Sequence, residues 1–318
     1  MIKKQNTKSR KIFSVIVTLA ILFNMAPVFV IDHFSGTAEA AGYDFDIADL
    51  TAYDIEESIH TTLGKIAESG DEDHPGCGMI TLNNDYQENI EIPDNTVVVI
   101  DLNGHTLAPA GSTARSNILV YGTLKLIDSA GGGMMQSDGT TDISAVNVLS
   151  GGKLVFGGGT INNYYSSQNG AGIMVEDNGY LNMKGGTISH CKSDLQGGGI
   201  YAYLSENVDF SGGTVISNQA TNGGGITCYR VNKNGEIDLN EMTVSGNTAT
   251  ENGGGVYIEY ASTIHLNRSV VENNTAQNGG GLYFNNTTKL DIDDNSRIRS
   301  NTASQSGGGI FFFAATNY

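Results

Sequence analysis

The sequence predicts an all-β protein built as a parallel β-helix, a solenoid in which each coil of about 26–30 residues contributes three short strands. Two observations carry this prediction: a recurring glycine triplet, and short stretches of alternating apolar and polar residues between the triplets. Self-similarity at a near-constant period of this size is typical of solenoids. The triplets, each followed by an aliphatic residue, begin at Gly197, Gly223, Gly253, Gly279 and Gly307.

Each repeat contains three stretches that suit strands, for example residues 256–259, 264–266 and 271–274. Alternation with a period of two indicates strands, and these units lack the spacing of a helix. Coils stacked about 4.8 Å apart would align equivalent residues in columns, with apolar columns inside. We expect the glycines at one corner, where a positive φ or close backbone approach excludes a Cβ. At another corner, side-chain amides can bond one another. The asparagines there are Asn218, Asn247, Asn274 and Asn301.

The two motifs of the repeat also resemble those of a known family. Gly-Gly-Gly-Ile/Val/Leu paired with Ile/Val-x-x-Asn is similar to the GGA(I/L/V) and FxxN pair of the polymorphic outer-membrane protein repeats, over roughly residues 143–318. That family lies within the pectate-lyase-like group, so the resemblance implies a right-handed β-helix. Gly replaces Ala, and Val or Ile replaces Phe, in this sequence. Both motifs are structural, so the resemblance implies a fold rather than an activity.

Residues 1–40 have the features of a signal peptide. A basic start is followed by an apolar stretch over residues 12–31 and by a small-x-small cleavage site, Ala38-Glu39-Ala40. This pattern predicts a bacterial protein that is secreted or displayed at the cell surface, with no membrane insertion after cleavage. The length and basic start are typical of Gram-positive signals. The basic residues are Lys3, Lys4, Lys8, Arg10 and Lys11.

The formal net charge of −17 limits the partners of the chain. Nucleic acids and anionic membranes attract basic proteins, so both are excluded as expected partners. The charge is compatible with cations, neutral glycans or basic proteins. It is also what solubility alone would require of an exported protein.

We expect a lead-in and an N-terminal capping helix over residues 41–78, followed by about seven full coils and a fragment of a further coil of β-helix over residues 79–318. The helix is predicted over residues 54–68, with Asp54 and Glu57 as a capping pair. A helix here would cover the open end of the solenoid, which otherwise invites association. Its apolar stripe is Ile55, Ile59, Leu63 and Ile66.

The other end of the solenoid has no such cover in the sequence. The chain stops at Tyr318, shortly after the aromatic strand 310–313. Terminal repeats usually carry a polar outer face. We therefore expect the β-helix to be truncated here, with the rest of a longer chain or a capping partner over this end.

Aromatic residues recur on the outward face of the strand that follows each triplet. Exposed apolar surface of this kind often marks a contact site, and aromatic rings suit sugars. The alternative is that aromatic residues simply favour strands and stack on one another. The candidate glycan- or protein-binding residues are Tyr201, Tyr203, Tyr229, Tyr257, Tyr283 and Phe311.

A second outward column lies on the middle strand and carries titratable groups. Asp209 and Asp238 are predicted to be neighbours about 5 Å apart, a repulsion that a bound cation or a raised pKa would relieve. These two residues are the candidate calcium ligands. In pectate-lyase-like enzymes, to which the fold resemblance points, carboxylates on one face hold calcium or act as acid and base. The candidate catalytic residues are Asp209, Asp238, His265 and Asp291.

Three functions follow from these columns. The first is a secreted or surface β-helix that binds a glycan or a surface protein in the manner of an adhesin. The second is a calcium-dependent polysaccharide lyase or glycoside hydrolase, although the catalytic motifs of those enzymes are not matched residue by residue. The third is a passive spacer, in which neither column matters.

Overall fold

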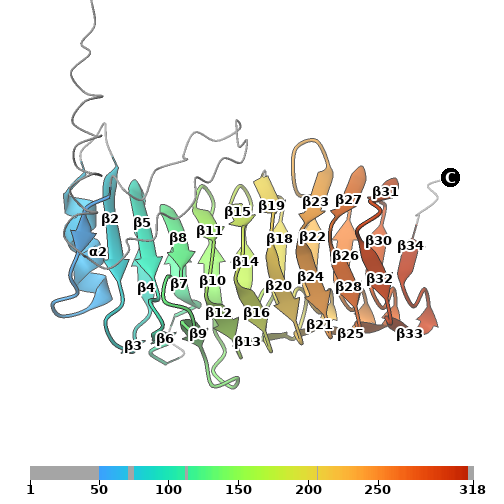
Figure 1. The fold of residues 1–318 in the computed structure, drawn as a ribbon, viewed down its shortest axis with the longest axis horizontal. Coiled ribbons are helices and arrows are strands. Elements are labelled where there is room, and N and C mark those ends of the chain that lie inside the picture. The colour runs from blue at the N-terminus through green and yellow to red at the C-terminus, as the bar shows by residue number, and fades with distance from the viewer. Residues whose placement is uncertain (1–49, 71–74, 112–113, 206, 314–318) are drawn as a thin grey trace, which may run out of the picture. The chain divides into compact units, whose positions relative to one another are not determined.

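The computed structural model describes residues 50–70, 75–111, 114–205 and 207–313. These residues belong to one compact unit, Asp46–Tyr318, which is a stack of coils (Figure 1). The predicted signal peptide, most of the lead-in and Tyr318 lie outside the described residues. Within the described ranges, no helix is long and apolar enough to cross a membrane.

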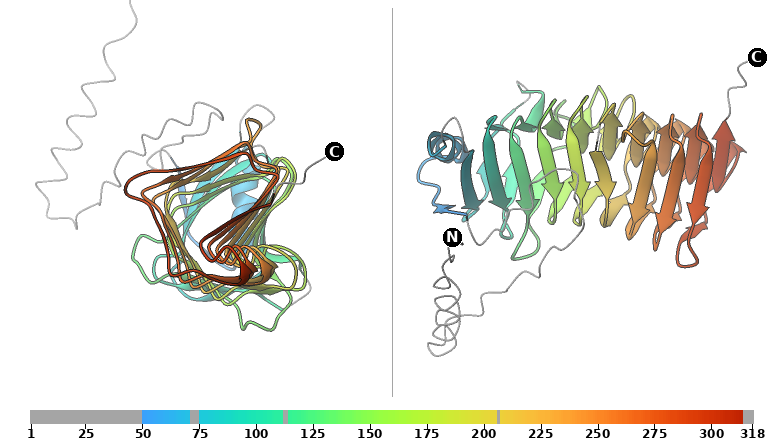
Figure 2. Two further views of the ribbon diagram at one scale, coloured as in Figure 1. Left: turned by 90° about the vertical axis from the view of Figure 1, so that its right-hand side faces the viewer. Right: turned by 90° about the horizontal axis from the view of Figure 1, so that it is seen from above.

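The strands form four parallel sheets, which the two further views show running along the stack (Figure 2). Sheet A contains β1 (Ala52–Tyr53), β2 (Gly76–Thr81), β5 (Thr96–Asp101), β8 (Thr123–Ile127), β11 (Lys153–Phe156), β15 (Tyr180–Met183), β19 (Asn207–Phe210), β23 (Glu236–Asn240), β27 (Thr263–Asn267) and β31 (Lys289–Ile292). Sheet B contains β3 (Tyr86–Gln87), β6 (Thr106–Ala108), β9 (Met134–Gln136), β12 (Thr160–Asn162), β16 (Thr187–Ser189), β20 (Gly213–Ile216), β24 (Met242–Ser245), β28 (Val270–Glu272) and β32 (Arg297–Arg299).

The remaining two sheets complete the cross-section of the coil. Sheet C contains β4 (Ile90–Ile92), β7 (Ser116–Val120), β10 (Ser144–Val148), β14 (Ile173–Val175), β18 (Ile200–Tyr203), β22 (Ile226–Tyr229), β26 (Val256–Glu259), β30 (Leu282–Asn285) and β34 (Ile310–Phe313). Sheet D contains β13 (Tyr165–Ser166), β17 (Lys192–Ser193), β21 (Gln219–Asn222), β25 (Thr248–Asn252), β29 (Thr275–Asn278) and β33 (Thr302–Ser306).

This topology confirms the parallel β-helix with three principal strands in each coil. The nine strands of sheets B and C show about nine turns, so the expected count of seven was too low. The first coils lack a glycine triplet, and the period is therefore invisible there. Sheet D adds a fourth, short strand in six coils, which sequence reasoning missed. Its inward side chains are small, and the buried ones include Ser166, Ser193, Ala220, Ala249 and Ala276.

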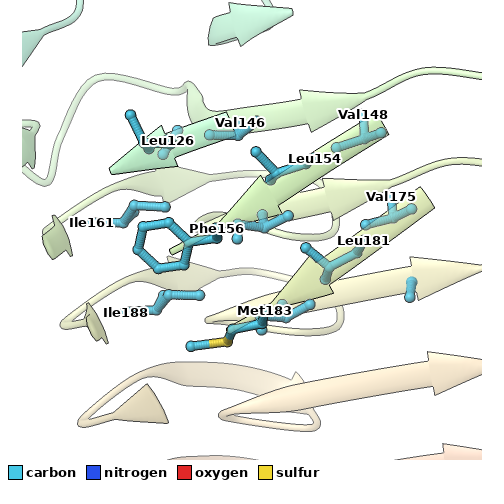
Figure 3. Packing of buried hydrophobic residues seen from close by; sticks show 14 of the residues in the cluster. Leu126, Val146, Val148, Leu154, Phe156, Ile161, Val175, Leu181, Met183 and Ile188 are labelled. Carbon is cyan, nitrogen blue, oxygen red and sulfur yellow. The ribbon is translucent and has the colours of Figure 1, made fainter. Parts of the chain in front are cut away.

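The core lies inside the coils and is continuous along them. Leu154 pairs in register with Leu181, and Phe156 with Met183, so equivalent apolar side chains stack from coil to coil (Figure 3). All four of these side chains are fully buried. Burial of such columns stabilises the stack by about 25 cal/mol for each Å² of apolar surface removed from water. The predicted inward columns are thereby confirmed.

The glycine triplets serve the corner in the two ways expected. The first glycine of a triplet has a left-handed backbone, with φ of +66° at Gly253. The second has no room for a side chain, because a Cβ at Gly254 would lie 2.5 Å from the carbonyl oxygen of Thr275 and against that of Gly280. These coils therefore approach more closely at the corner than any other residue would permit.

The asparagine column forms a buried ladder, as predicted. The Asn247 side-chain oxygen accepts hydrogen bonds from the backbone and the side-chain amide of Asn218, at 2.9 and 3.0 Å. The side-chain amide of Asn247 donates to the carbonyl oxygen of Val215 at 2.9 Å and to the side-chain oxygen of Asn274 at 3.0 Å. Each amide group thus bonds both a coil and the neighbouring rung, which fixes the register of the stack.

The N-terminal cap is shorter than predicted. Helix α2 spans Ile59–Glu68, and Ser58 rather than Asp54 is its N-cap, with the Ser58 hydroxyl accepting from the Thr61 backbone amide at 3.0 Å. The predicted start at Asp54, with its Glu57 partner, was therefore wrong. The Glu88 carboxylate accepts hydrogen bonds from the backbone amides of Ile59 and His60. The capping carboxylate therefore comes from outside the helix and not from Glu57. The inward stripe of Ile59, Leu63 and Ile66 is confirmed.

Gly64 offers a test of this helix. It lies on the exposed face of α2, and a Cβ there would meet nothing within 4 Å. Glycine in a helix interior costs roughly 1 kcal/mol relative to alanine. We expect Gly64→Ala to raise the free energy of unfolding by about 0.5–1 kcal/mol in chemical denaturation. An unchanged or lower stability would contradict the assigned helix.

The last described coil leaves apolar side chains uncovered. Phe312 and Ile292 are 47% and 46% exposed, although their counterparts in the preceding coils face the core. A capping partner or further coils over this end remains a prediction.

Candidate functional site

The outward aromatic residues of sheet C separate into buried and exposed members. Tyr201, Tyr257 and Tyr283 are only 7–8% exposed. Tyr257 stacks on Tyr283 with ring centroids 5.2 Å apart, and Tyr283 stacks on Phe311 at the same distance. These rings cover one another, so they do not form the open row that the alternation predicted.

The glycine corner explains this burial. It folds back over the outer face of sheet C, so that a Cβ at Gly279 would lie 2.8 Å from the Cβ of Tyr283. Thr227, fully buried, interrupts the column between Tyr201 and Tyr257. Burial also raises the pKa of the Tyr201 hydroxyl to about 12. A ligand would therefore reach little of these three tyrosines.

An accessible aromatic cluster lies where the strands of sheet C end. Tyr203, the last residue of β18, stacks on Tyr229, the last residue of β22, with centroids 5.2 Å apart. Tyr229 meets Tyr260 edge-to-face at 5.6 Å. Tyr203 is 38% and Tyr260 40% exposed. The rings combine apolar surface with hydroxyl groups, a mixture suited to sugars.

Arg230 completes this cluster, and sequence reasoning missed both it and Tyr260. The Arg230 guanidinium lies 4.3 Å from the centroid of the Tyr260 ring and 5.5 Å from that of Tyr229. Both residues follow directly after a strand, in turns of different length, so alternation within strands could not reveal them. We call Tyr203, Tyr229, Arg230 and Tyr260 the corner cluster.

The backbone at this corner is left-handed in successive coils. The residue after each strand has φ of +48° at Leu204, +48° at Arg230, +61° at Tyr260 and +52° at Asn286. Asparagine tolerates this conformation, whereas bulky side chains adopt it at a cost of roughly 1–2 kcal/mol. Such strain is often retained at functional sites. Arg230 and Tyr260 occupy positions that asparagine would fill at lower cost.

A carboxylate lies beside the corner cluster. Glu259 is the register partner of Tyr229 in the next coil. It accepts hydrogen bonds from the Tyr257 hydroxyl at 3.1 Å and from the Asn285 amide at 3.0 Å. The outer face of sheet C thus offers aromatic surface, one guanidinium and one bonded carboxylate within neighbouring coils.

The second candidate column lies on sheet A, as predicted, and its members differ in environment. Asp238 is exposed, whereas Asp209, His265 and Asp291 are half-buried. The Asp291 carboxylate pairs with the Lys289 ammonium at 2.7 Å and lies 3.5 Å from the His265 ring. This pairing removes Asp291 from the role of a free acid or base.

Asp209 is the perturbed member of this column. Burial, with the neighbouring Asp238 carboxylate as a second cause, raises the pKa of Asp209 above its ordinary value of 3.8. The raised pKa is one of the two reliefs expected for this pair. The other, a cation, would need more ligands: no group of three His, Cys, Asp or Glu side chains converges on a metal position in the described part of the chain. Two carboxylates are few for Ca²⁺, which takes about six to eight oxygen ligands.

The raised pKa of Asp209 predicts how the stability of the Asp209→Asn variant depends on pH. The folded state holds the Asp209 proton more tightly than the unfolded state, so stability falls as pH rises above about 4 through the folded-state pKa. The variant lacks this loss. We expect the melting temperature of Asp209→Asn, relative to the unmutated protein, to rise between about pH 4 and pH 7.

Asp291→Asn is the matched control. It breaks the partly exposed pair with Lys289, which costs up to about 1 kcal/mol at neutral pH. A pH-independent difference for Asp209→Asn, or the same sign for both variants, would contradict the assigned environments.

Part of the sequence matches a known protein family. The family described as right-handed β-helix region matches residues 140–296. The chain therefore contains a right-handed β-helix. The matched β-helix region contains the corner cluster and the whole Asp209–Asp291 column. The curated proteins and the solved structures give no match to the chain. The comparisons therefore show the fold and name no activity, and the closer resemblance to polymorphic outer-membrane protein repeats stays a prediction.

Proposed function

We propose that this β-helix binds glycans through the corner cluster, as a secreted or surface protein of adhesin type. The observation that carries the proposal is the accessible stack of Tyr203 and Tyr229, extended by Tyr260. Exposed aromatic rings with hydroxyl groups contact sugars through both apolar surface and hydrogen bonds. The rigid stack of coils fixes their spacing, so little side-chain order has to be gained on binding.

The location of the protein is part of the same proposal. The basic and apolar start of the sequence, followed by Ala38-Glu39-Ala40, supports export. An exported binding protein meets glycans on host cells or in its surroundings. The net charge of −17 fits neutral sugars better than polyanions.

The proposal predicts the effect of removing the exposed rings. We expect Tyr203→Ala to weaken glycan binding about tenfold, because a central aromatic contact is typically worth more than about 1 kcal/mol. Tyr203→Ala combined with Tyr260→Ala should abolish measurable binding. Affinity electrophoresis or calorimetric titration, with glycans that the unmutated chain retains, measures the change.

The chain provides a matched control in Tyr121. This tyrosine follows β7 at the equivalent position of an earlier coil and is 42% exposed. Tyr121→Ala should leave binding unchanged. Equal loss with Tyr121→Ala, or full binding by the double variant, would rule out the corner cluster as the binding site.

A second candidate function rests on the raised pKa of Asp209. A carboxyl group that keeps its proton can act as a general acid, and Asp238 beside it could serve as the base of a glycoside hydrolase or lyase. Under this alternative, Asp209→Asn and Asp238→Asn would each abolish product release from a polysaccharide. Calcium would then have to bridge these carboxylates with water or substrate oxygens as further ligands. Retained turnover in both variants would exclude this column.

A further inference from the structure

Arg230 differs from the other members of the corner cluster because it brings a charge to an aromatic surface. Its guanidinium lies over Tyr260 at 4.3 Å and is exposed to solvent. Among the described residues, no carboxylate forms an ion pair with it. Stacking fixes the plane of a guanidinium and leaves its edge available. The N–H groups along that edge can donate to both oxygens of a carboxylate.

We propose that Arg230 and Tyr260 form a position for a single acidic sugar within an otherwise neutral glycan. This inference rests on the proposed glycan binding and names its ligand class. The Arg230 guanidinium would take the carboxylate of the sugar. The exposed rings of Tyr203 and Tyr260 would contact that sugar and its neutral neighbour.

The surrounding charges favour an isolated acidic group over a densely charged polymer. Glu259 lies in the next coil beside Tyr229, and its carboxylate would repel a second anion. The whole chain carries −17 and would repel a polyanion at long range. One guanidinium can balance one carboxylate. A chain with an anion on every sugar would place further charges against this surface.

The strain at this corner supports a role for the side chain itself. Arg230 adopts φ of +48°, where asparagine, found at the equivalent Asn286, would be less strained. The backbone conformation alone would therefore favour asparagine over arginine here. It also makes Arg230→Asn a clean test, since the variant should fold at least as stably as the unmutated chain.

The experiment compares matched glycans by calorimetric titration. The probes are lactose with sialyllactose, a neutral xylo-oligosaccharide with its glucuronic-acid-substituted form, and polygalacturonate as a densely charged polymer. We expect the acidic member of at least one pair to bind about tenfold more tightly than its neutral match, and polygalacturonate to bind more weakly per sugar. Arg230→Asn should erase the preference, so that both members of each pair bind alike. Arg230→Lys, which keeps the charge without the planar fork, should retain only part of it.

Leu204→Asn is the control for the turn, because it changes the equivalent left-handed residue of the preceding coil. It should leave the acidic preference unchanged. Equal affinity for both members of every pair, or an undiminished preference in Arg230→Asn, would overturn the inference while leaving glycan binding standing. Absence of binding to every probe would overturn the inference and the proposed function together.

Discussion

Gly254→Ala should lower the stability of the β-helix by about 3 kcal/mol or more, which places it among the most severe single substitutions. The added Cβ would lie 2.5 Å from the Thr275 carbonyl oxygen and against that of Gly280. Both atoms are backbone of the next coil and cannot turn aside as a side chain would. The coils must separate at the corner or lose their hydrogen bonds there.

Chemical denaturation followed by circular dichroism measures this change. Gly64→Ala is the control, since it makes the same substitution where space is free and should have the opposite sign. Two variants with equal stabilities would show that glycine affects this protein through the unfolded chain and not through close approach of the coils.

Asn247→Asp should destabilise the stack by about 3–5 kcal/mol at neutral pH. The substitution keeps the shape of the side chain and replaces its amide by oxygen. That oxygen would face the Val215 carbonyl and the Asn274 side-chain oxygen, which now receive hydrogen bonds from Asn247. A charge would also be buried at a position with no exposed surface.

The pH dependence of the melting temperature tests this explanation. When protonated, the new carboxyl group of the Asn247→Asp variant can donate one hydrogen bond, so the loss should shrink as pH falls toward about 4. Asn252→Asp is the control, because Asn252 lies in a half-buried ladder with Asn222 and Asn278 where water can solvate a charge. Equal losses at both sites would contradict the account of the buried ladder.

The sequence could predict those parts of the fold that repeat at a fixed period. The triplet glycines, the buried asparagines and the inward columns all return from coil to coil, so a single physical reason applies many times. The same logic fails where a coil is unusual. The first coils have no triplet, and helix α2 takes its N-terminal contacts from Glu88, which is distant in the sequence.

The candidate site was predicted in part, for a related reason. Alternation identified Tyr203 and Tyr229 as outward residues, and both lie in the corner cluster. It also identified Tyr257 and Tyr283, which prove to be buried because the glycine corner and neighbouring rings cover them. Arg230 and Tyr260 lie in turns, where side-chain direction depends on a left-handed backbone that no strand pattern encodes.

The raised pKa of Asp209 on sheet A was predicted from only one of its two causes. The direction of the Asp209 pKa followed from its predicted neighbour Asp238. Burial is the larger cause, and alternation, which places Asp209 on the outward face, could not show how far that face is covered.

Glycan binding is tested most simply with the chain from Ala41 and a panel of polysaccharides, first with calcium and then with a chelator. Retention and product release are read from the same samples, with Tyr203→Ala and Tyr121→Ala beside the unmutated chain. We expect retention that survives the chelator, is weakened about tenfold in Tyr203→Ala and persists in Tyr121→Ala, with release of neither new reducing ends nor unsaturated sugars. Product that appears with calcium and vanishes with the chelator would contradict this expectation and assign the function to Asp209 and Asp238.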